Sequence, residues 1–142
     1  MSYLLDTCVL SELRKPTADP NVVAWINAVD EFHLFLSVIT FGEIQKGIAK
    51  LDESKRKRSL QLWLEQSLPE RFAGRILEID GEVALEWGEL QGGLARSENP
   101  VPVIDSMIAA TAICYNLTLV TRNIADFNRM PVKLLNPWMK IG

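Results

Sequence analysis

Short apolar runs alternate with longer stretches of helical pattern along almost the whole chain. Such runs are typical of buried β-strands, and they are expected at residues 3–5, 32–39, 75–80, 117–121 and 132–135. The stretches between them predict helices at residues 7–16, 19–29, 40–51, 52–69, 81–96, 105–115 and, as a single turn, 123–128. This alternation favours a parallel sheet with helices on both faces. No linker or repeat interrupts it, so we expect one α/β domain over residues 1–142.

The composition is that of a chain with one core and little net charge. Its 142 residues are 48% apolar, and 15 basic against 18 acidic residues leave a net charge of −3. A general nucleic-acid-coating protein would be strongly basic. The apolar runs are too short to span a bilayer, and Asp6 and Glu12 interrupt any signal-peptide pattern. We expect a soluble, cytoplasmic protein with no membrane contact, in which Cys8 and Cys114 are reduced.

Four acidic residues are expected at one edge of this sheet. In such a fold the carboxyl ends of the strands and the amino ends of the following helices share an edge, where ligands bind. The four are Asp6 after the first strand, Glu43 after the second, Asp105 before the fourth and Asp126 after the fourth. Without a cation, two carboxylates about 4 Å apart repel by roughly 4 kcal/mol at an effective dielectric of ~20. Oxygen ligands at this density suit Mg²⁺ or Mn²⁺.

Each of these acids also has a purely structural interpretation. Asp is a favoured helix N-cap, so Asp105 can simply cap its helix, and Asp126 can be a solvated turn residue. Thr40 and Glu43 have the spacing of a capping box. Asp80 ends a strand before a helix in the same way as the four, and position in the chain alone does not separate it from them.

Small polar and basic residues flank the four acids. Hydroxyl and amide groups can orient a carboxylate or a metal-bound water, and the candidates are Thr7, Ser11, Thr121 and Asn123. Cations can contact phosphates, and the candidates are Arg14, Lys15, Lys46 and Arg122. Each of these residues also has a structural alternative: a helix cap or a turn residue for the polar ones, and a solvated surface charge for the basic ones. The basic run at 55–58 is best explained as the exposed face of a helix, and His33 as a structural residue within a strand.

Four segments carry the candidate acids: YLLDTCVLSEL, TFGEIQKG, PVIDSMIAATA and LVTRNIADF. They resemble the signature blocks of PIN domains, in the family's order and spacing, from about Tyr3 to Trp138. The closest resemblance is to the toxin nucleases of the VapBC and FitAB type. It implies a doubly wound sheet of five parallel strands with the first strand at its centre. It also implies that Asp6, Glu43, Asp105 and Asp126 form a catalytic Mg²⁺ or Mn²⁺ site, supported by Thr7, Thr121 and Asn123.

The same resemblance implies an activity and partners. It implies an endoribonuclease. The mechanism that we hypothesise from the same residues is hydrolysis of RNA phosphodiester bonds by a metal-activated water, which leaves 5′-phosphate ends. The usual partner is a small VapB- or FitA-like antitoxin whose C-terminal segment covers the toxin and blocks the site. A homodimer and a larger toxin–antitoxin assembly on DNA are expected. Asp80 matches no metal position of the family and is interpreted as a helix cap.

Two other interpretations remain open. A phosphotransfer domain of receiver type is also doubly wound, but it requires an adjacent acidic pair and a Lys at the end of the last strand. Here Asp6 has no acidic neighbour, and Lys133 lies near the start of that strand. A regulatory PIN module that acts mainly in complex with a DNA-binding antitoxin would keep the same acids while cleaving little RNA itself.

Overall fold

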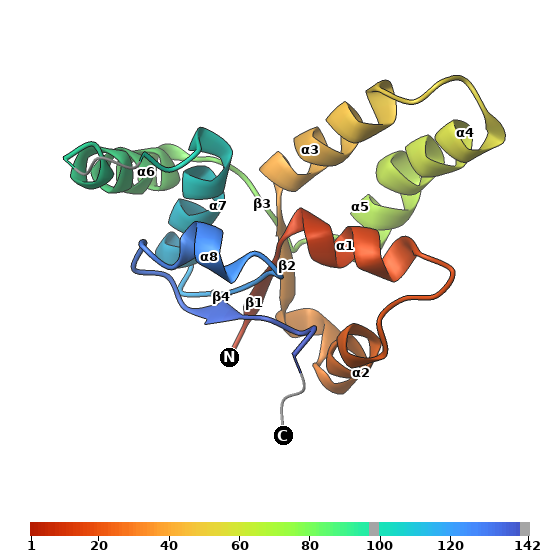
Figure 1. Cartoon of the computed structure of the whole chain (residues 1–142), viewed down its shortest axis with the longest axis horizontal. Coiled ribbons are helices and arrows are strands. Elements are labelled where there is room, and N and C mark those ends of the chain that lie inside the picture. Colours follow the sequence, from red (N-terminus) through yellow and green to blue (C-terminus); the bar gives the residue numbers. More distant parts are fainter. Residues whose placement is uncertain (97–99, 140–142) are drawn as a thin grey trace.

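The computed structural model describes residues 1–96 and 100–139 and contains a five-stranded, all-parallel sheet (Figure 1). The strands are β1 Tyr3–Leu5, β2 Leu34–Ser37, β3 Ile76–Leu77, β4 Thr118–Val120 and β5 Leu134–Leu135. Their order in the sheet is β3-β2-β1-β4-β5. The predicted fold, a parallel sheet with the first strand at its centre, is confirmed.

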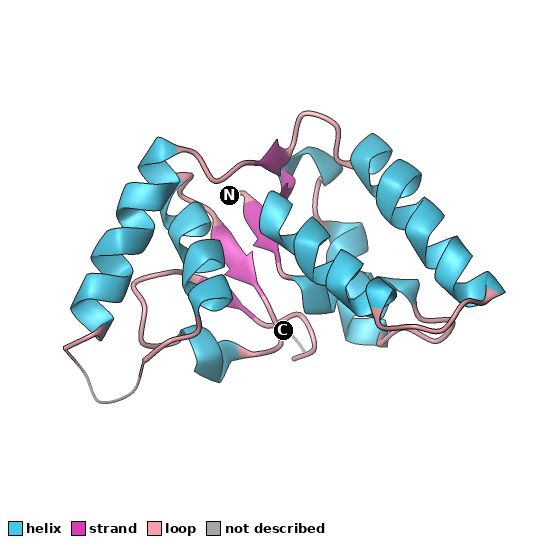
Figure 2. Ribbon diagram, turned by 90° about the horizontal axis from the view of Figure 1, so that it is seen from above, coloured by secondary structure: helices cyan, strands magenta, loops and turns pink. Residues whose placement is uncertain are grey.

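Helices cover both faces of the sheet, as Figures 1 and 2 show from two directions. One face carries α1 (Thr7–Arg14), α2 (Pro20–Ala28), α3 (Val38–Ala49), α4 (Lys55–Leu62), the π-helical turn η2 (Trp63–Ser67) and α5 (Leu68–Arg71). The other carries α6 (Gly81–Leu94), α7 (Val103–Cys114) and α8 (Ile124–Phe127). Leu5 of β1 belongs to the first of these two cores and Leu4 to the second. Among the described residues, none of the helices combines the length and the apolar character needed to cross a membrane.

The central strand is paired on both sides. Tyr3 lies opposite Leu34 of β2 and opposite Thr118 of β4. One residue beyond β1, the N–H of Asp6 still donates to the carbonyl oxygen of Val120 at 3.0 Å. Because neighbours on both sides hold the backbone up to this point, the place where the chain leaves the sheet is fixed, and with it the position of Asp6.

Residues 32 and 33 do not belong to the strand predicted for 32–39. Glu31–His33 form a 3₁₀ turn (η1), which Asp30 caps by accepting the N–H of Phe32 at 3.0 Å. His33 is exposed, and its Nδ1 lies 3.1 Å from the hydroxyl oxygen of Ser2. The placement of His33 within a strand is therefore wrong.

The helix after β2 begins earlier than predicted. Ser37 is its N-cap, because the Ser37 hydroxyl accepts the N–H of Ile39 at 3.1 Å. Thr40 is only 1% exposed and lies inside α3. The capping box that we considered for Thr40 and Glu43 is therefore wrong, and the Glu43 side chain is available for other contacts.

Two further boundaries differ from the predicted ones. The helix predicted for 52–69 begins only after its N-cap Ser54, and it widens into a π-helical turn at Trp63–Ser67 before continuing as α5. Pro102 occupies the N-cap position of α7, so Asp105 lies within the first turn rather than at the cap. The structural interpretation of Asp105 as an N-cap is therefore wrong.

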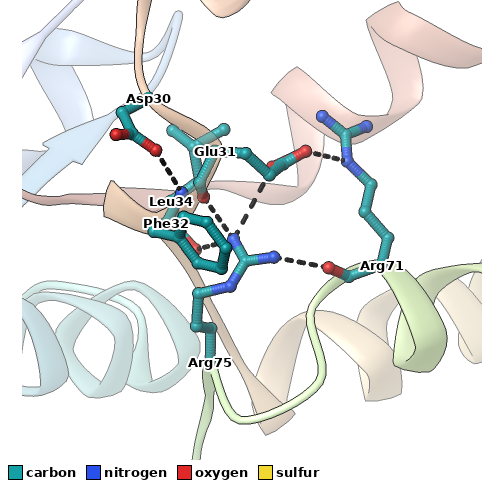
Figure 3. Close-up of polar contacts among 6 residues, drawn as sticks. All are labelled: Asp30, Glu31, Phe32, Leu34, Arg71 and Arg75. Carbon is teal, nitrogen blue, oxygen red and sulfur yellow. Dashed lines mark hydrogen bonds and ion pairs between the residues drawn. The ribbon is translucent and has the colours of Figure 1, made fainter.

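A buried arginine ties the start of β2 to the segment before β3 (Figure 3). Arg75 is 8% exposed, and its guanidinium donates to the backbone carbonyl oxygens of Glu31, Leu34 and Arg71. Its Nη1 lies 3.6 Å from Oε2 of Glu31, and its Cζ lies 5.7 Å from the centre of the Phe32 ring. We call these contacts the Arg75 clamp. Because the strands are parallel, the clamp lies at the amino ends of β2 and β3, opposite the acidic edge.

Candidate functional site

Asp6 lies at the carboxyl end of the central strand and is 8% exposed. Its Oδ1 accepts the N–H of Thr7 at 2.9 Å, so the residue also caps α1. Its Oδ2 accepts a hydrogen bond from the Thr121 hydroxyl at 2.8 Å and a weaker one from Cys8 Sγ at 3.7 Å. Burial raises the pKa of Asp6, while these hydrogen bonds lower it. Each carboxylate oxygen has two lone pairs, so capping leaves acceptor capacity for a cation.

Thr121 directly follows β4, the neighbour of β1 in the sheet, and its side chain contacts the same carboxylate. It is fully buried, and its Oγ1 accepts the N–H of Asn123 at 3.0 Å while donating to Asp6. A hydroxyl whose donor and acceptor roles are both filled is held in one orientation. Asn123 therefore acts here through its backbone, and its amide side chain forms no hydrogen bond with another described residue.

Thr7 joins α1 to α3 at the same edge. Its Oγ1 donates a 2.7 Å hydrogen bond to Oε1 of Glu43. This contact holds the Glu43 carboxylate near the start of α1. Ser11, one turn further along α1, is exposed, and no hydrogen bond joins it to any of the four acids in the described part of the chain. The structure therefore gives Ser11 no supporting contact.

Asp105 and Asp126 approach from α7 and α8. Burial, together with the negative charges of Asp126, Asp6 and Glu43, raises the pKa of Asp105 to about 6. The four carboxylates therefore lie near enough to act on one another. We call them the acidic cluster. Neither Asp105 nor Asp126 forms a hydrogen bond through its side chain, or an ion pair, with another described residue.

The acidic cluster suits a hard divalent cation in ligand type and in charge. All four groups are carboxylates, and among the described residues no Lys, Arg or His forms an ion pair with any of them. Mg²⁺ and Mn²⁺ prefer such oxygen ligands. Within residues 1–96 and 100–139, however, no three His, Cys, Asp or Glu side chains gather closely enough to hold a metal ion. The cluster is thus open rather than a closed cage, and metal binding stays a prediction.

The two candidate arginines are exposed and each lies over an indole ring. The Cζ of Arg14 is 5.3 Å from the centre of the Trp63 ring, and that of Arg122 is 5.5 Å from the centre of the Trp138 ring. Stacking of this kind leaves guanidinium N–H groups available for phosphate oxygens. Both side chains therefore remain candidates for RNA contacts.

The two candidate lysines differ from each other. Lys15 forms an ion pair with Glu12 at 3.0 Å. Lys46 is exposed and lines a pocket together with Glu43 of the acidic cluster. Of the two, Lys46 is the better placed to contact a phosphate beside the cluster.

Cys8 is a contact of the site that sequence reasoning missed. Its thiol donates to Asp6, lies 3.7 Å from Oγ1 of Thr121, and accepts the N–H of Arg122 at 3.5 Å. Both Cys8 and Cys114 are free, as expected. The available signal was the position of Cys8 two residues after Asp6, in the first turn of the helix that Asp6 caps.

Comparisons with known proteins show the family and the fold of the chain. The family model of the PIN domain matches residues 3–133, a range that contains all four acids. Toxin FitB of Neisseria gonorrhoeae is 38% identical over 135 residues, which cover 95% of this chain and 97% of FitB. VapC ribonuclease Y4jK of Sinorhizobium fredii is 34% identical over 135 residues, which cover 95% of this chain and 96% of that protein. The structure of FitAB bound to an IR36 DNA fragment superposes with a TM-score of 0.90 at 35% identity, covering 99% of this chain and 98% of that chain.

The chain belongs to the PIN-domain family. Among the members of that family its similarity is to the toxins of the FitB and VapC type, over nearly their whole length. The family resemblance inferred from the four sequence segments is confirmed.

Proposed function

We propose that the protein is a metal-dependent endoribonuclease and the toxin of a type II toxin–antitoxin pair. The observation that carries the proposal is the acidic cluster: four carboxylates from separate parts of the chain act on one another, and no cationic side chain in residues 1–96 and 100–139 is ion-paired with them. Burial and the negative charges of the other three carboxylates together raise the pKa of Asp105 to about 6. The names of the relatives, a toxin and a VapC ribonuclease, support the same function.

In this function Asp6 and Asp105 hold Mg²⁺ or Mn²⁺ directly, and Glu43 and Asp126 complete the site directly or through water. Thr121 and Thr7 keep Asp6 and Glu43 in place through their hydroxyl hydrogen bonds. A bound divalent cation supplies Lewis acidity and a water of lowered pKa for attack on the phosphorus.

The cations at the same edge provide the remaining chemistry. Negative charge grows on the phosphoryl oxygens during attack, and a positioned Arg or Lys stabilises it. Lys46 lies beside Glu43, and Arg14 lies on the helix that Asp6 caps. We expect these two, together with Arg122, to contact RNA phosphates.

The partners proposed for the chain follow from its similarity to FitB. A small FitA- or VapB-like antitoxin inhibits the site, and the complex is a homodimer of toxins that assembles further on DNA. The similarity to the solved structure of FitAB on a DNA fragment, with a TM-score of 0.90, supports the antitoxin partner and the assembly on DNA.

The test is cleavage of RNA by purified Asp105→Asn and Asp6→Asn variants in Mg²⁺ and in Mn²⁺, with folding checked by circular dichroism. Asp80→Asn is the matched control, because Asp80 caps α6 and Asn is an equally good N-cap. We expect cleavage by the wild type and by Asp80→Asn only. Full cleavage by a folded Asp105→Asn variant would contradict the proposal.

A regulatory module without cleavage is separated from a nuclease by a second experiment. The protein is expressed alone and together with the product of the neighbouring gene. Growth arrest that requires Asp6 and disappears on co-expression supports the nuclease, whereas arrest by Asp6→Asn as strong as by the wild type favours the regulatory module.

A further inference from the structure

A groove opens beside the acidic cluster, between α1, α3 and α4. Its volume is about 490 Å³, within the usual range for a small-molecule site. Thr7 and Glu43 line it, and both also belong to the candidate site. Figure 1 shows the three helices on the same side of the sheet. The groove is therefore continuous with the place where the scissile phosphate is expected.

The floor of this groove is apolar and includes an aromatic ring. Its apolar lining residues are Ile44, Ile48, Leu51, Leu60 and Trp63. Trp63 is only partly buried and begins the π-helical turn η2, a distortion that is frequent at functional sites. Arg14 lies over this ring, with its Cζ 5.3 Å from the ring centre, and the part of the indole that stays open offers a surface on which a nucleobase can stack.

The rim of the groove is positively charged. Arg14, Lys15 and Arg56 line it, against Glu43 as the acidic lining residue. Lys15 is paired with Glu12, but neither arginine forms an ion pair with another described residue. In a protein of net charge −3, two such arginines around an apolar floor favour an anionic occupant that also has a flat apolar part.

We propose that this groove, which we call the base groove, binds one nucleotide of the RNA strand next to the phosphate that is cleaved. The base packs on the apolar floor against Trp63, and Arg14 and Arg56 contact the phosphates on either side of it. This inference rests on the proposed function, since the position of the groove matters only if the acidic cluster acts on RNA. A nucleotide satisfies the floor and the rim together. A peptide occupant would need its own acidic and apolar side chains in matching order.

Two residues of the same helix provide a matched test. Arg56 lines the base groove, whereas Arg58 does not, although both are exposed on α4 and neither is ion-paired with another described residue. Arg56→Gln and Arg58→Gln therefore change the net charge equally. Trp63→Leu removes the aromatic face, and Trp63→Phe keeps one.

Binding is measured by fluorescence anisotropy with a fluorescein-labelled pool of random ten-nucleotide RNA, in Ca²⁺, at several salt concentrations. Stacking on an aromatic side chain is worth about 1–3 kcal/mol per base, so we expect Trp63→Leu to weaken binding about tenfold and Trp63→Phe to restore most of it. Arg56→Gln should weaken binding and reduce the salt slope by about 0.7, the value for one phosphate contact on a single strand. Arg58→Gln should bind like the wild type.

The outcomes separate this inference from the proposed function. If binding follows the pattern above but the wild type cleaves no RNA in Mg²⁺ or Mn²⁺, the base groove stands and the nuclease proposal fails. If cleavage is normal and both Arg56→Gln and Trp63→Leu bind RNA like the wild type, the base groove is overturned. If Arg56→Gln and Trp63→Leu no longer co-purify with the product of the neighbouring gene but bind RNA like the wild type, the proposal of a base groove is also overturned. The groove is then assigned to a protein segment.

Discussion

Thr121 donates a hydrogen bond of 2.8 Å to Asp6 across 115 residues of sequence, and it does so from a fully buried position. The contact joins the carboxyl end of the central strand β1 to that of its neighbour β4. It also fills one acceptor position on the carboxylate that the proposed function needs ionised, and it lowers the pKa that burial raises.

Thr121→Val tests this contact with a side chain of nearly the same shape. We expect a loss of about 1–3 kcal/mol in the free energy of unfolding, because the buried Asp6 carboxylate loses a donor. RNA cleavage should fall by more than tenfold, since Asp6 then ionises less readily. Thr111→Val is the control: Thr111 is equally buried, but its hydroxyl donates to the carbonyl of Met107 within its own helix. Equal effects of the two changes on cleavage would refute a specific role for Thr121.

The raised pKa of Asp105 predicts how stability depends on pH when no metal is present. The pKa rises from 3.8 to about 6 on folding, so between these values the folded state binds a proton that the unfolded state has lost. The resulting slope is negative: the contribution of this group is full below pH 3.8 and is lost as pH rises through about 6. Urea unfolding in EDTA at pH 5 and pH 7.5 should show this loss in the wild type and a smaller one in Asp105→Asn. Identical profiles for both proteins would be evidence against a raised pKa of Asp105 in the folded protein.

Divalent cations should stabilise the folded protein, because they bind the acidic cluster only when it is assembled. At a free concentration about 100 times the dissociation constant, the gain in free energy of unfolding is about 2.7 kcal/mol. A thermal melt with increasing Mn²⁺ or Mg²⁺ measures it. We expect the rise in Tm to persist in Asp80→Asn and to be much smaller in Asp105→Asn. A rise of the same size in both variants would place the cation elsewhere.

The Arg75 clamp should matter for stability and not for chemistry. Arg75→Met removes the Arg75 donor from the carbonyl oxygens of Leu34 and Arg71, whereas the carbonyl oxygen of Glu31 keeps the N–H of Leu34, so we expect a loss of about 1–3 kcal/mol in the free energy of unfolding. Arg71→Met is the control, since Arg71 and Glu31 are both about 40% exposed and such pairs contribute about 0–1 kcal/mol. Chemical denaturation measures both. Cleavage per folded molecule should be unchanged, because the clamp lies at the opposite end of the strands.

Chain order alone predicted which edge of the sheet the acids occupy. Asp6 follows a strand, Asp105 precedes one, and parallel topology brings both to the same side. Asp80 could not be separated from them by position. In the structure it ends the segment after the outer strand β3, and its two oxygens accept the N–H of Val83 and the hydroxyl of Tyr115. How far Asp80 lies from the central strand depends on the order of the strands in the sheet. Hydrophobic periodicity in the sequence does not indicate that order.

The side-chain contacts of the site were outside the reach of sequence reasoning. The hydrogen bond from Thr7 to Glu43 depends on where α3 begins, and that was misplaced because Ser37, not Thr40, caps the helix. The base groove was missed as well. The apolar pattern of residues 60–68 indicated a buried helix face, and only the packing of α1 against α3 and α4 shows that Trp63 stays partly open.

The strand order has a consequence for how the protein is made. Asp6 and Glu43 are synthesised early, but Thr121 and Asp126 come from β4 and the segment after it. A nascent chain that ends before β4 leaves the central strand with a neighbour on one side only, and it lacks Asp126 of the acidic cluster and the Thr121 hydroxyl that donates to Asp6. For the nuclease proposed above, this means that a chain aborted before β4 lacks one carboxylate of the acidic cluster and the hydroxyl that holds Asp6, so the full site forms only after β4 and α8 have been synthesised.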